Sequence, residues 1–211
     1  MRPTNPPPEP LDATLLPGQP WFWFGCAVQA GLGVVGAGLL WLQGRPLDAL
    51  FQVDARGVGL GVAAALPMFL FFHRLMTTPR GVFVPVRRFL ESTLRPVMRA
   101  WSGSQIACLA VLAGVGEEIL FRGAIQGWVS ERAGEAAGLL LASALFGLAH
   151  SVNRVYAITA GVMGIYLGLL AQVTGSLVAP MVTHALYDFL ALLWLVRTGH
   201  PRLADIAMPP E

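Results

Sequence analysis

The residues best suited to chemistry lie in three apolar segments of the chain. They are Glu117, Glu118 and Arg122 in the first segment, His150 in the second, and His184 and Asp188 in the third. A carboxylate and two imidazoles that share a water-accessible pocket can deprotonate a water and stabilise an oxyanion. The residue types therefore indicate hydrolysis, provided that the fold brings the three segments together.

The first of these segments is too highly charged to face lipid. Inserting three ionised side chains, those of Glu117, Glu118 and Arg122, costs about 8 to 10 kcal/mol, while the nine strongly apolar residues of the same helix return only about 4 kcal/mol. We expect the three charges to face the interior of a helical bundle, where they are paired, protonated or wetted.

Helix geometry separates the roles of the two glutamates. At about 100° per residue, Arg122 lies about 40° around the axis from Glu118 but about 140° from Glu117. Glu118 and Arg122 are expected to neutralise each other, which leaves Glu117 without a local partner and suited to act as a general base. In the alternative interpretation, the pair is purely structural and Glu117 is protonated and idle.

Two hydrolytic mechanisms fit these side chains. In one, Glu117 and His150 hold and deprotonate a water while His184 donates to the oxyanion. In the other, the same three residues bind zinc and leave one position open for water. The sequence lacks the compact HExxH signature, so a zinc ion would need ligands from three separate helices, and we favour the mechanism without a cofactor.

Asp188 lies one helical turn from His184 on the same face. A carboxylate at this position can fix the tautomer of His184, and it can donate a hydrogen bond itself if it carries a proton. An ordinary helix-stabilising pair is the third interpretation of this spacing.

Composition places these residues in a membrane protein. Of the 211 residues, 55% are hydrophobic and 12% charged, with a mean hydropathy of +0.62, whereas soluble domains carry about 25% charged residues. A net charge of +2 gives no support for nucleic-acid binding. The expected partners are the lipid bilayer and a membrane-associated protein or peptide substrate.

The hydrophobic pattern predicts an all-α, polytopic membrane bundle with about six transmembrane helices. The predicted segments are 21–43, 57–75, 104–128, 136–151, 155–173 and 176–197. Counted from the non-cytoplasmic helix ends, Glu117, His150 and His184 lie about 16, 21 and 12 Å deep. All three can meet near mid-bilayer in one polar pocket.

The chain divides into four parts. They are a Pro-rich cytoplasmic leader at 1–20, two transmembrane helices with an Arg-rich connection at 21–103, a catalytic helical core at 104–197, and a short tail at 198–211. The connection carries six arginines against a single acid, Glu91, which predicts a cytoplasmic location for it and for both termini. Its middle, Pro85 to Ala100, is expected to form a basic amphipathic helix on the anionic leaflet.

Three motifs in the core resemble those of a known family. "EEILFR" matches an EExxxR motif, "FGLAH" (Phe146 to His150) an FxxxH motif, and "HALYD" an HxxxB motif in which B is Asp or Asn. In this order on hydrophobic helices they are similar to the CPBP family of intramembrane proteases, which includes the CAAX prenyl endopeptidases. The resemblance covers about residues 104 to 197.

The resemblance implies a bundle with a polar cavity opening between helices and peptide-bond hydrolysis near the membrane surface. We expect the protein in a bacterial inner membrane. The resemblance assigns the catalytic glutamate to Glu117, the water-holding histidine to His150 and the oxyanion-side histidine to His184, with Glu118, Arg122 and Phe146 supporting. The last motif position in the family is often Asn, an amide donor. Here it is Asp188, which donates only if protonated and otherwise orients His184.

The substrate expected from this resemblance is a membrane-associated protein that is prenylated, lipidated or anchored by its C-terminus. Two other classes of protein use buried polar residues in a bundle. One is a non-catalytic scaffold or bacteriocin-immunity protein that binds a partner through the same polar core. The other is a proton-coupled transporter, which the absence of inverted repeats and broken helices in matched positions disfavours.

Overall fold

The computed structural model describes residues 18–46, 50–78 and 81–198 and is helical throughout, with no strand in those ranges. The helices, in chain order, are α1 (Gly18–Leu42), α2 (Ala55–Thr77), α3 (Val84–Phe89), η3 (Leu90–Leu94), α4 (Arg95–Met98), α5 (Gly103–Glu118), η4 (Ile119–Gln126), α6 (Gly127–Ala133), α7 (Glu135–Ala149), α8 (Arg154–Thr174) and α9 (Val178–Arg197). The predicted all-α polytopic bundle is confirmed.

Five helical stretches are long and apolar enough to cross a membrane: α1, α2, the continuous α5–η4–α6 stretch Gly103–Ala133, α8 and α9. The remaining predicted segment forms α7, which has 15 residues and is shorter than a full span. Six helices therefore occur where six are predicted, and the number that cross the membrane stays a prediction. The third helix is longer than predicted because it continues past residue 128 to Ala133.

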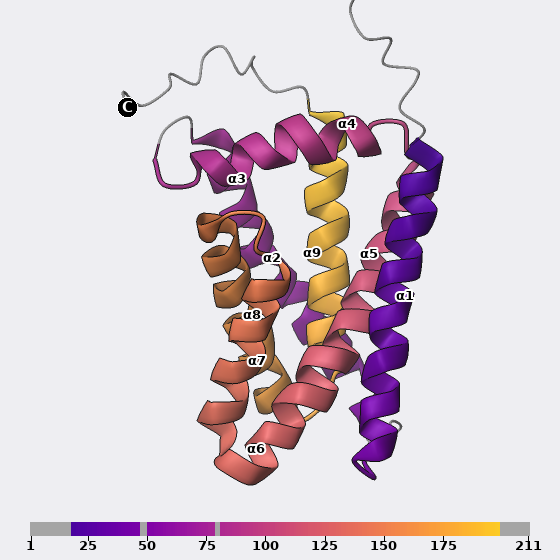
Figure 1. The fold of residues 1–211 in the computed structure, drawn as a ribbon, viewed down its shortest axis with the longest axis vertical. Helices are drawn as coiled ribbons and strands as arrows, with labels where there is room; N and C mark the ends of the chain where they lie inside the picture. Colours follow the sequence, from indigo (N-terminus) through magenta and orange to yellow (C-terminus); the bar gives the residue numbers. More distant parts are fainter. Residues whose placement is uncertain (1–17, 47–49, 79–80, 199–211) are drawn as a thin grey trace, which may run out of the picture.

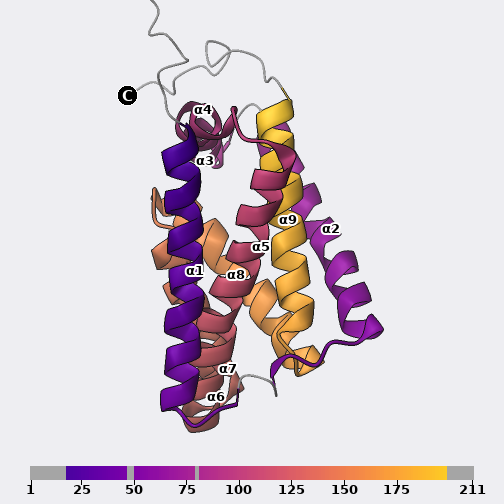
Figure 2. The same ribbon diagram turned by 90° about the vertical axis from the view of Figure 1, so that its right-hand side faces the viewer.

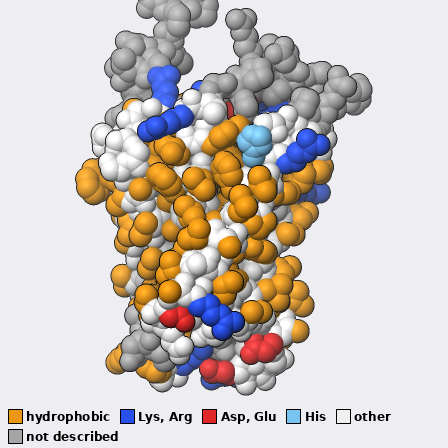
Figure 3. Space-filling model, turned by 180° about the vertical axis from the view of Figure 1, so that it is seen from behind, with side chains coloured by type: hydrophobic (Ala, Val, Ile, Leu, Met, Phe, Trp, Pro, Cys, Tyr) orange, Lys and Arg blue, Asp and Glu red, His pale blue; other side chains and the backbone are white. Residues whose placement is uncertain are grey.

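The surface of the bundle matches a lipid environment. Large apolar side chains such as Trp41 and Val173 are 79% and 82% exposed. Figure 3 shows a broad hydrophobic band on one face of the molecule, with charged side chains gathered above and below it. Such a band would be unstable in water, and the chain is an integral membrane protein.

Helix α9 runs through the middle of the bundle (Figure 1). It packs against α2 on one side and α5 on the other, and α1 covers the outer face of α5 (Figure 2). Helices α7 and α8 form an antiparallel pair beside η4 and α9. This arrangement places the three motif-bearing helices next to one another.

The Arg-rich connection forms a helical segment, α3–η3–α4, that lies across one end of the bundle (Figure 1). Its inner face buries Val86, Leu90 and Met98, whereas Arg88 and Arg99 are exposed. This is the amphipathic helix predicted for residues 85–100, shifted by one or two residues. The start of α1 and the end of α9 lie at the same end of the bundle.

Two glycines beside the glutamate pair allow three helices to approach closely. A Cβ on Gly114 would lie 2.7 Å from the backbone nitrogen of Ala185 in α9. A Cβ on Gly116 would collide with the backbone oxygen of Gln29 in α1. Helix α5 is therefore fixed between α9 and α1 at the level of its carboxylates.

The predicted leader and tail fall almost wholly outside the described residues. Helix α1 begins at Gly18, three residues before the predicted start, and α9 ends at Arg197, as predicted. The division of the chain into a leader, an N-terminal part, a catalytic core and a tail stays a prediction.

Candidate functional site

The ion pair between Glu118 and Arg122 lies where the α-helix α5 passes into the wider π-helical segment η4. At Ile119 the α-helix becomes the π-helical segment η4, and Glu118 and Arg122 flank this transition. Arg122 Nη1 lies 2.9 Å from Glu118 Oε1, and neither residue is appreciably exposed. The predicted pair is present, and π-helical segments of this kind occur often at functional sites.

Arg122 also ties the charged helix to the α7–α8 pair. Its Nη2 donates to the carbonyl oxygen of Gly164 in α8 at 3.0 Å, and its guanidinium lies 4.5 Å from the centre of the Phe146 ring in α7. A planar, multi-donor cation is suited to such simultaneous contacts. Phe146, predicted as a supporting residue, is buried between the motif helices.

Glu118 has a second partner that helix geometry alone did not predict. Its Oε1 lies 2.8 Å from Nδ1 of His184 in α9. Because Glu118 is paired with Arg122, we treat it as ionised, so the ring nitrogen carries the proton and donates. This bond fixes the orientation of His184 and leaves Nε2 to face the cavity.

The carboxylate of Asp188 lies near Nε2, the second ring nitrogen of His184. Its Oδ2 is 3.6 Å from His184 Nε2, one turn along α9. The carboxylate is therefore beyond ordinary hydrogen-bond distance but close enough to attract a proton on Nε2. The bond to Glu118 keeps the proton on Nδ1 and so fixes the tautomer of His184. From the sequence alone, Asp188 is a candidate for that role.

Glu117 turns away from the ion pair and faces His150. Its Oε2 lies 3.8 Å from His150 Nε2, and Oε2 has no hydrogen-bond partner within the described residues. His150 caps the C-terminus of α7, and its Nδ1 lies 2.8 Å from the carbonyl oxygen of Phe146. A carbonyl only accepts, so the proton sits on Nδ1 and the lone pair of Nε2 points toward Glu117.

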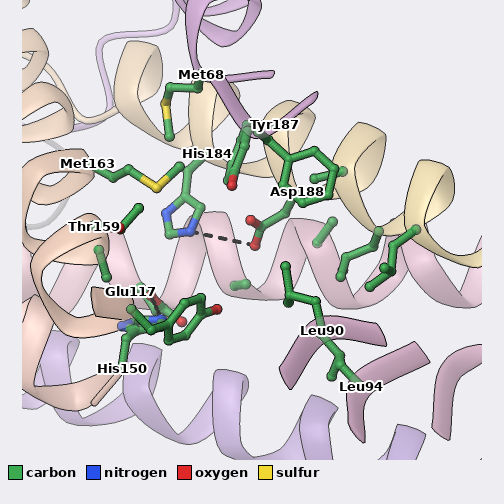
Figure 4. Close-up of a pocket in the computed structure, with 18 of the residues that line it drawn as sticks. Met68, Leu90, Leu94, Glu117, His150, Thr159, Met163, His184, Tyr187 and Asp188 are labelled. Carbon is green, nitrogen blue, oxygen red and sulfur yellow. Dashed lines mark ion pairs between the residues drawn. The ribbon is translucent and has the colours of Figure 1, made fainter. Parts of the chain in front are cut away.

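These side chains line one cavity of about 230 Å³. Glu117 and His150 lie on one side and His184 with Asp188 on the other (Figure 4). Another wall of the cavity is the apolar inner face of the surface helix, which includes Leu90 and Leu94 (Figure 4). The structure thus brings all four predicted catalytic residues to a single cavity inside the bundle, whose other lining residues are mostly apolar.

A second, almost wholly apolar groove of about 390 Å³ opens beside this cavity. It lies between α2 and α8, and its lining residues include Pro67, Phe71, Ile158 and Val162. The two share the lining residues Met68, Phe71, Thr159 and Met163, so the groove reaches the cavity wall from the side of the bundle.

The zinc mechanism considered above needs Glu117, His150 and His184 around one ion. No group of three or more His, Cys, Asp or Glu residues within residues 18–46, 50–78 and 81–198 is arranged to hold a metal ion. The bond from Nδ1 of His184 to Glu118 leaves Nε2 facing the cavity, so the preference for the mechanism without a cofactor stays a prediction.

Two features of the site lie outside the motifs. Tyr156 and Thr159 of α8 line the cavity, although α8 carries no motif residue. The spacing of six residues between His150 and Tyr156 across a helix break gives no periodic signal. Only the turn between α7 and α8 reveals that the two residues are neighbours.

Residues 99–190 match the family model described as type II CAAX prenyl endopeptidase Rce1-like. No curated protein and no solved structure matches the chain. The match confirms the resemblance to the CAAX prenyl endopeptidases and spans all three motifs. Residues 99–190 are therefore similar to the CAAX-type intramembrane proteases, and they lie within a membrane-helical protein.

Proposed function

We propose that this Rce1-like protein is an intramembrane endopeptidase in which Glu117 and His150 activate a water to cleave a peptide bond of a membrane-associated protein. The observation that carries the proposal is the facing pair Glu117 Oε2 and His150 Nε2, 3.8 Å apart in the cavity. One water oxygen can lie at an ordinary distance of about 2.8 Å from both atoms.

The two acceptors orient such a water for attack. Its protons point to Glu117 Oε2 and to the lone pair of His150 Nε2, so an oxygen lone pair is left to attack the scissile carbonyl carbon. Glu117 takes one proton as the C–O bond forms and the carbonyl oxygen becomes an oxyanion. When the C–N bond breaks, Glu117 returns that proton to the leaving amine, and acid and amine products result.

His184 is placed to stabilise the oxyanion from the opposite side of the cavity. Its Nδ1 donates to Glu118, so donation into the cavity requires a proton on Nε2 as well. The carboxylates of Glu118 and Asp188 lie at the two nitrogens of this ring and supply the negative charge that a doubly protonated imidazole needs. No cofactor enters this scheme.

The apolar groove between α2 and α8 supports lateral access for the substrate. A prenyl group, an acyl chain or an apolar C-terminal anchor can lie in this groove while the adjacent peptide reaches the cavity past Met68 and Met163. The substrate class proposed is accordingly a membrane-associated protein whose cleavage site lies close to an apolar group.

Orientation follows from the Arg-rich surface helix. We propose that α3–η3–α4 and both chain ends face the cytoplasm in a bacterial inner membrane, because arginines gather in cytoplasmic connections. The cavity lies directly below this helix, so cleavage would take place near the cytoplasmic surface.

The decisive experiment compares wild-type protein with Glu117→Gln by C-terminal peptide mapping of the membrane proteome. Glu117→Gln should abolish the cleavage products while the protein stays folded and inserted, and Glu91→Gln on the surface helix serves as the charge-matched control. Full activity of Glu117→Gln would contradict the assignment of Glu117 as the general base. A wild-type protein that yields no product, yet captures a partner through the cavity, would instead support the non-catalytic scaffold.

A further inference from the structure

In the proposed hydrolysis, the oxyanion receives a hydrogen bond from a single side chain, that of His184. An amide at the last motif position could donate a hydrogen bond, but the residue there is Asp188, whose Oδ2 lies 3.6 Å from His184 Nε2. An ionised carboxylate only accepts hydrogen bonds and repels a developing negative charge. If the proposed function is correct, His184 needs a second donor in the cavity.

Tyr156 is positioned close to the reacting groups. It lies in the first turn of α8, where its backbone nitrogen donates to the capping side chain of Asn153 at 2.9 Å. Its ring packs between His150, with centroids 6.3 Å apart, and Phe89 of the surface helix at 5.9 Å. The residue lines the same cavity as Glu117 and His184.

The hydroxyl of Tyr156 is available for a ligand. It makes no hydrogen bond to any residue that the structure describes, unlike the hydroxyl of Tyr166, which donates to the carbonyl oxygen of Ala64 at 3.0 Å. Asp188 and Glu117 line the same cavity from opposite sides (Figure 4). Tyr156 therefore shares the cavity with both acidic groups.

We propose that Tyr156 is a catalytic hydrogen-bond donor whose hydroxyl binds the carbonyl oxygen of the scissile peptide bond and stabilises the oxyanion together with His184. The phenol keeps its proton throughout, so the reaction balance given above is unchanged. The donor that Asp188 cannot supply is thus delivered from α8 instead of α9.

Tyr187 is the nearest competitor for this role. It lines the cavity too, and both tyrosines border the same apolar cluster. The ring of Tyr187 packs edge-on against Phe72 at 6.3 Å, however, whereas the ring of Tyr156 packs against His150. The third tyrosine of the chain, Tyr166, lines the apolar groove and not the cavity, and it serves as a comparison.

The first test compares the three Tyr→Phe variants in a cleavage assay on detergent-solubilised protein with one peptide substrate. Tyr156→Phe should lower kcat about 100-fold with little change in KM, the effect of removing one oxyanion donor. Tyr187→Phe and Tyr166→Phe should each lower kcat at least tenfold less than Tyr156→Phe does. Each Phe removes one oxygen atom, and thermal unfolding of each variant monitors the fold.

The second test removes or replaces Asp188. Asp188→Asn gains an amide donor, so the Tyr156→Phe penalty should shrink at least tenfold in that background. Asp188→Ala gains none, and the full penalty should persist there. A penalty that vanishes in Asp188→Ala would show that Tyr156 acts through Asp188, which overturns its contact with the substrate.

The outcomes also separate this role from the proposed function. Wild-type protein without any cleavage overturns the proposed function, and the role of Tyr156 with it. An active wild type, an inactive Glu117→Gln and a fully active Tyr156→Phe would keep the protease and overturn only the donor role.

Discussion

Nδ1 of His184 lies 2.8 Å from Oε1 of Glu118, which joins the second glutamate of α5 to the histidine of α9. Glu118 binds Arg122 through the same oxygen. The adjacent Glu117 contacts neither residue and faces His150. Two neighbouring carboxylates thus have separate tasks, one in holding helices together and the other in the proposed chemistry.

Glu118→Gln tests whether Glu118 contributes to stability and Glu117 does not. It removes the charge that balances Arg122 inside the bundle, and breaking a buried pair in this way costs about 3 to 5 kcal/mol of folding free energy. Thermal unfolding in detergent should show a marked loss for Glu118→Gln and little change for Glu117→Gln. Equal loss in both variants would contradict the division of roles.

Arg122→Lys tests the bridge to α7 and α8. A lysine keeps the charge but cannot bind Glu118, reach the Gly164 carbonyl and stack on Phe146 at the same time. We expect lower stability and at least tenfold lower cleavage, measured on the same purified sample. Arg132→Lys, on an exposed turn of α6, is the control and should behave as wild type.

The Glu118–Arg122 pair and the shared cavity could be predicted from sequence because helices have a fixed period and rise. Those rules place Arg122 beside Glu118 and bring Glu117, His150 and His184 to one level of the bundle. The bond between Glu118 and His184 depends on how α5 packs against α9, which no period within one helix determines. The position of Tyr156 likewise depends on the turn between α7 and α8.

Close packing at Gly114 should be as important as the catalytic groups. An added Cβ would meet the backbone of Ala185 at 2.7 Å, so Gly114→Ala must displace α9 and with it His184. Overpacking of this kind costs about 1 to 3 kcal/mol, and cleavage should fall as well. Gly38→Ala in α1, where nothing lies within 4 Å, is the matched control.

Chelation distinguishes the two hydrolytic mechanisms. Because no group of three His, Cys, Asp or Glu residues in the described ranges is arranged to hold a metal ion, we expect full cleavage after dialysis against a strong chelator, with zinc far below one ion per chain by elemental analysis. Activity that disappears on dialysis and returns with zinc alone would restore the zinc mechanism that the sequence left open.

Cysteine labelling tests the orientation that we propose. The chain has two cysteines, Cys26 and Cys108, and replacing both by Ala gives a background for single probes. Ser92→Cys lies on the exposed side of the Arg-rich surface helix, and Ala133→Cys lies at the end of α6 at the opposite pole of the bundle (Figure 1).

The positive-inside rule predicts opposite labelling of these two probes by a membrane-impermeant maleimide. In spheroplasts the probe at position 133 should react and the probe at 92 should not, and inverted vesicles should reverse the pattern. Since the cavity lies just below the surface helix, this result would place the proposed cleavage at the cytoplasmic face. Labelling of position 92 in spheroplasts would show that the protein has the opposite orientation and that the cavity lies near the outer face of the membrane.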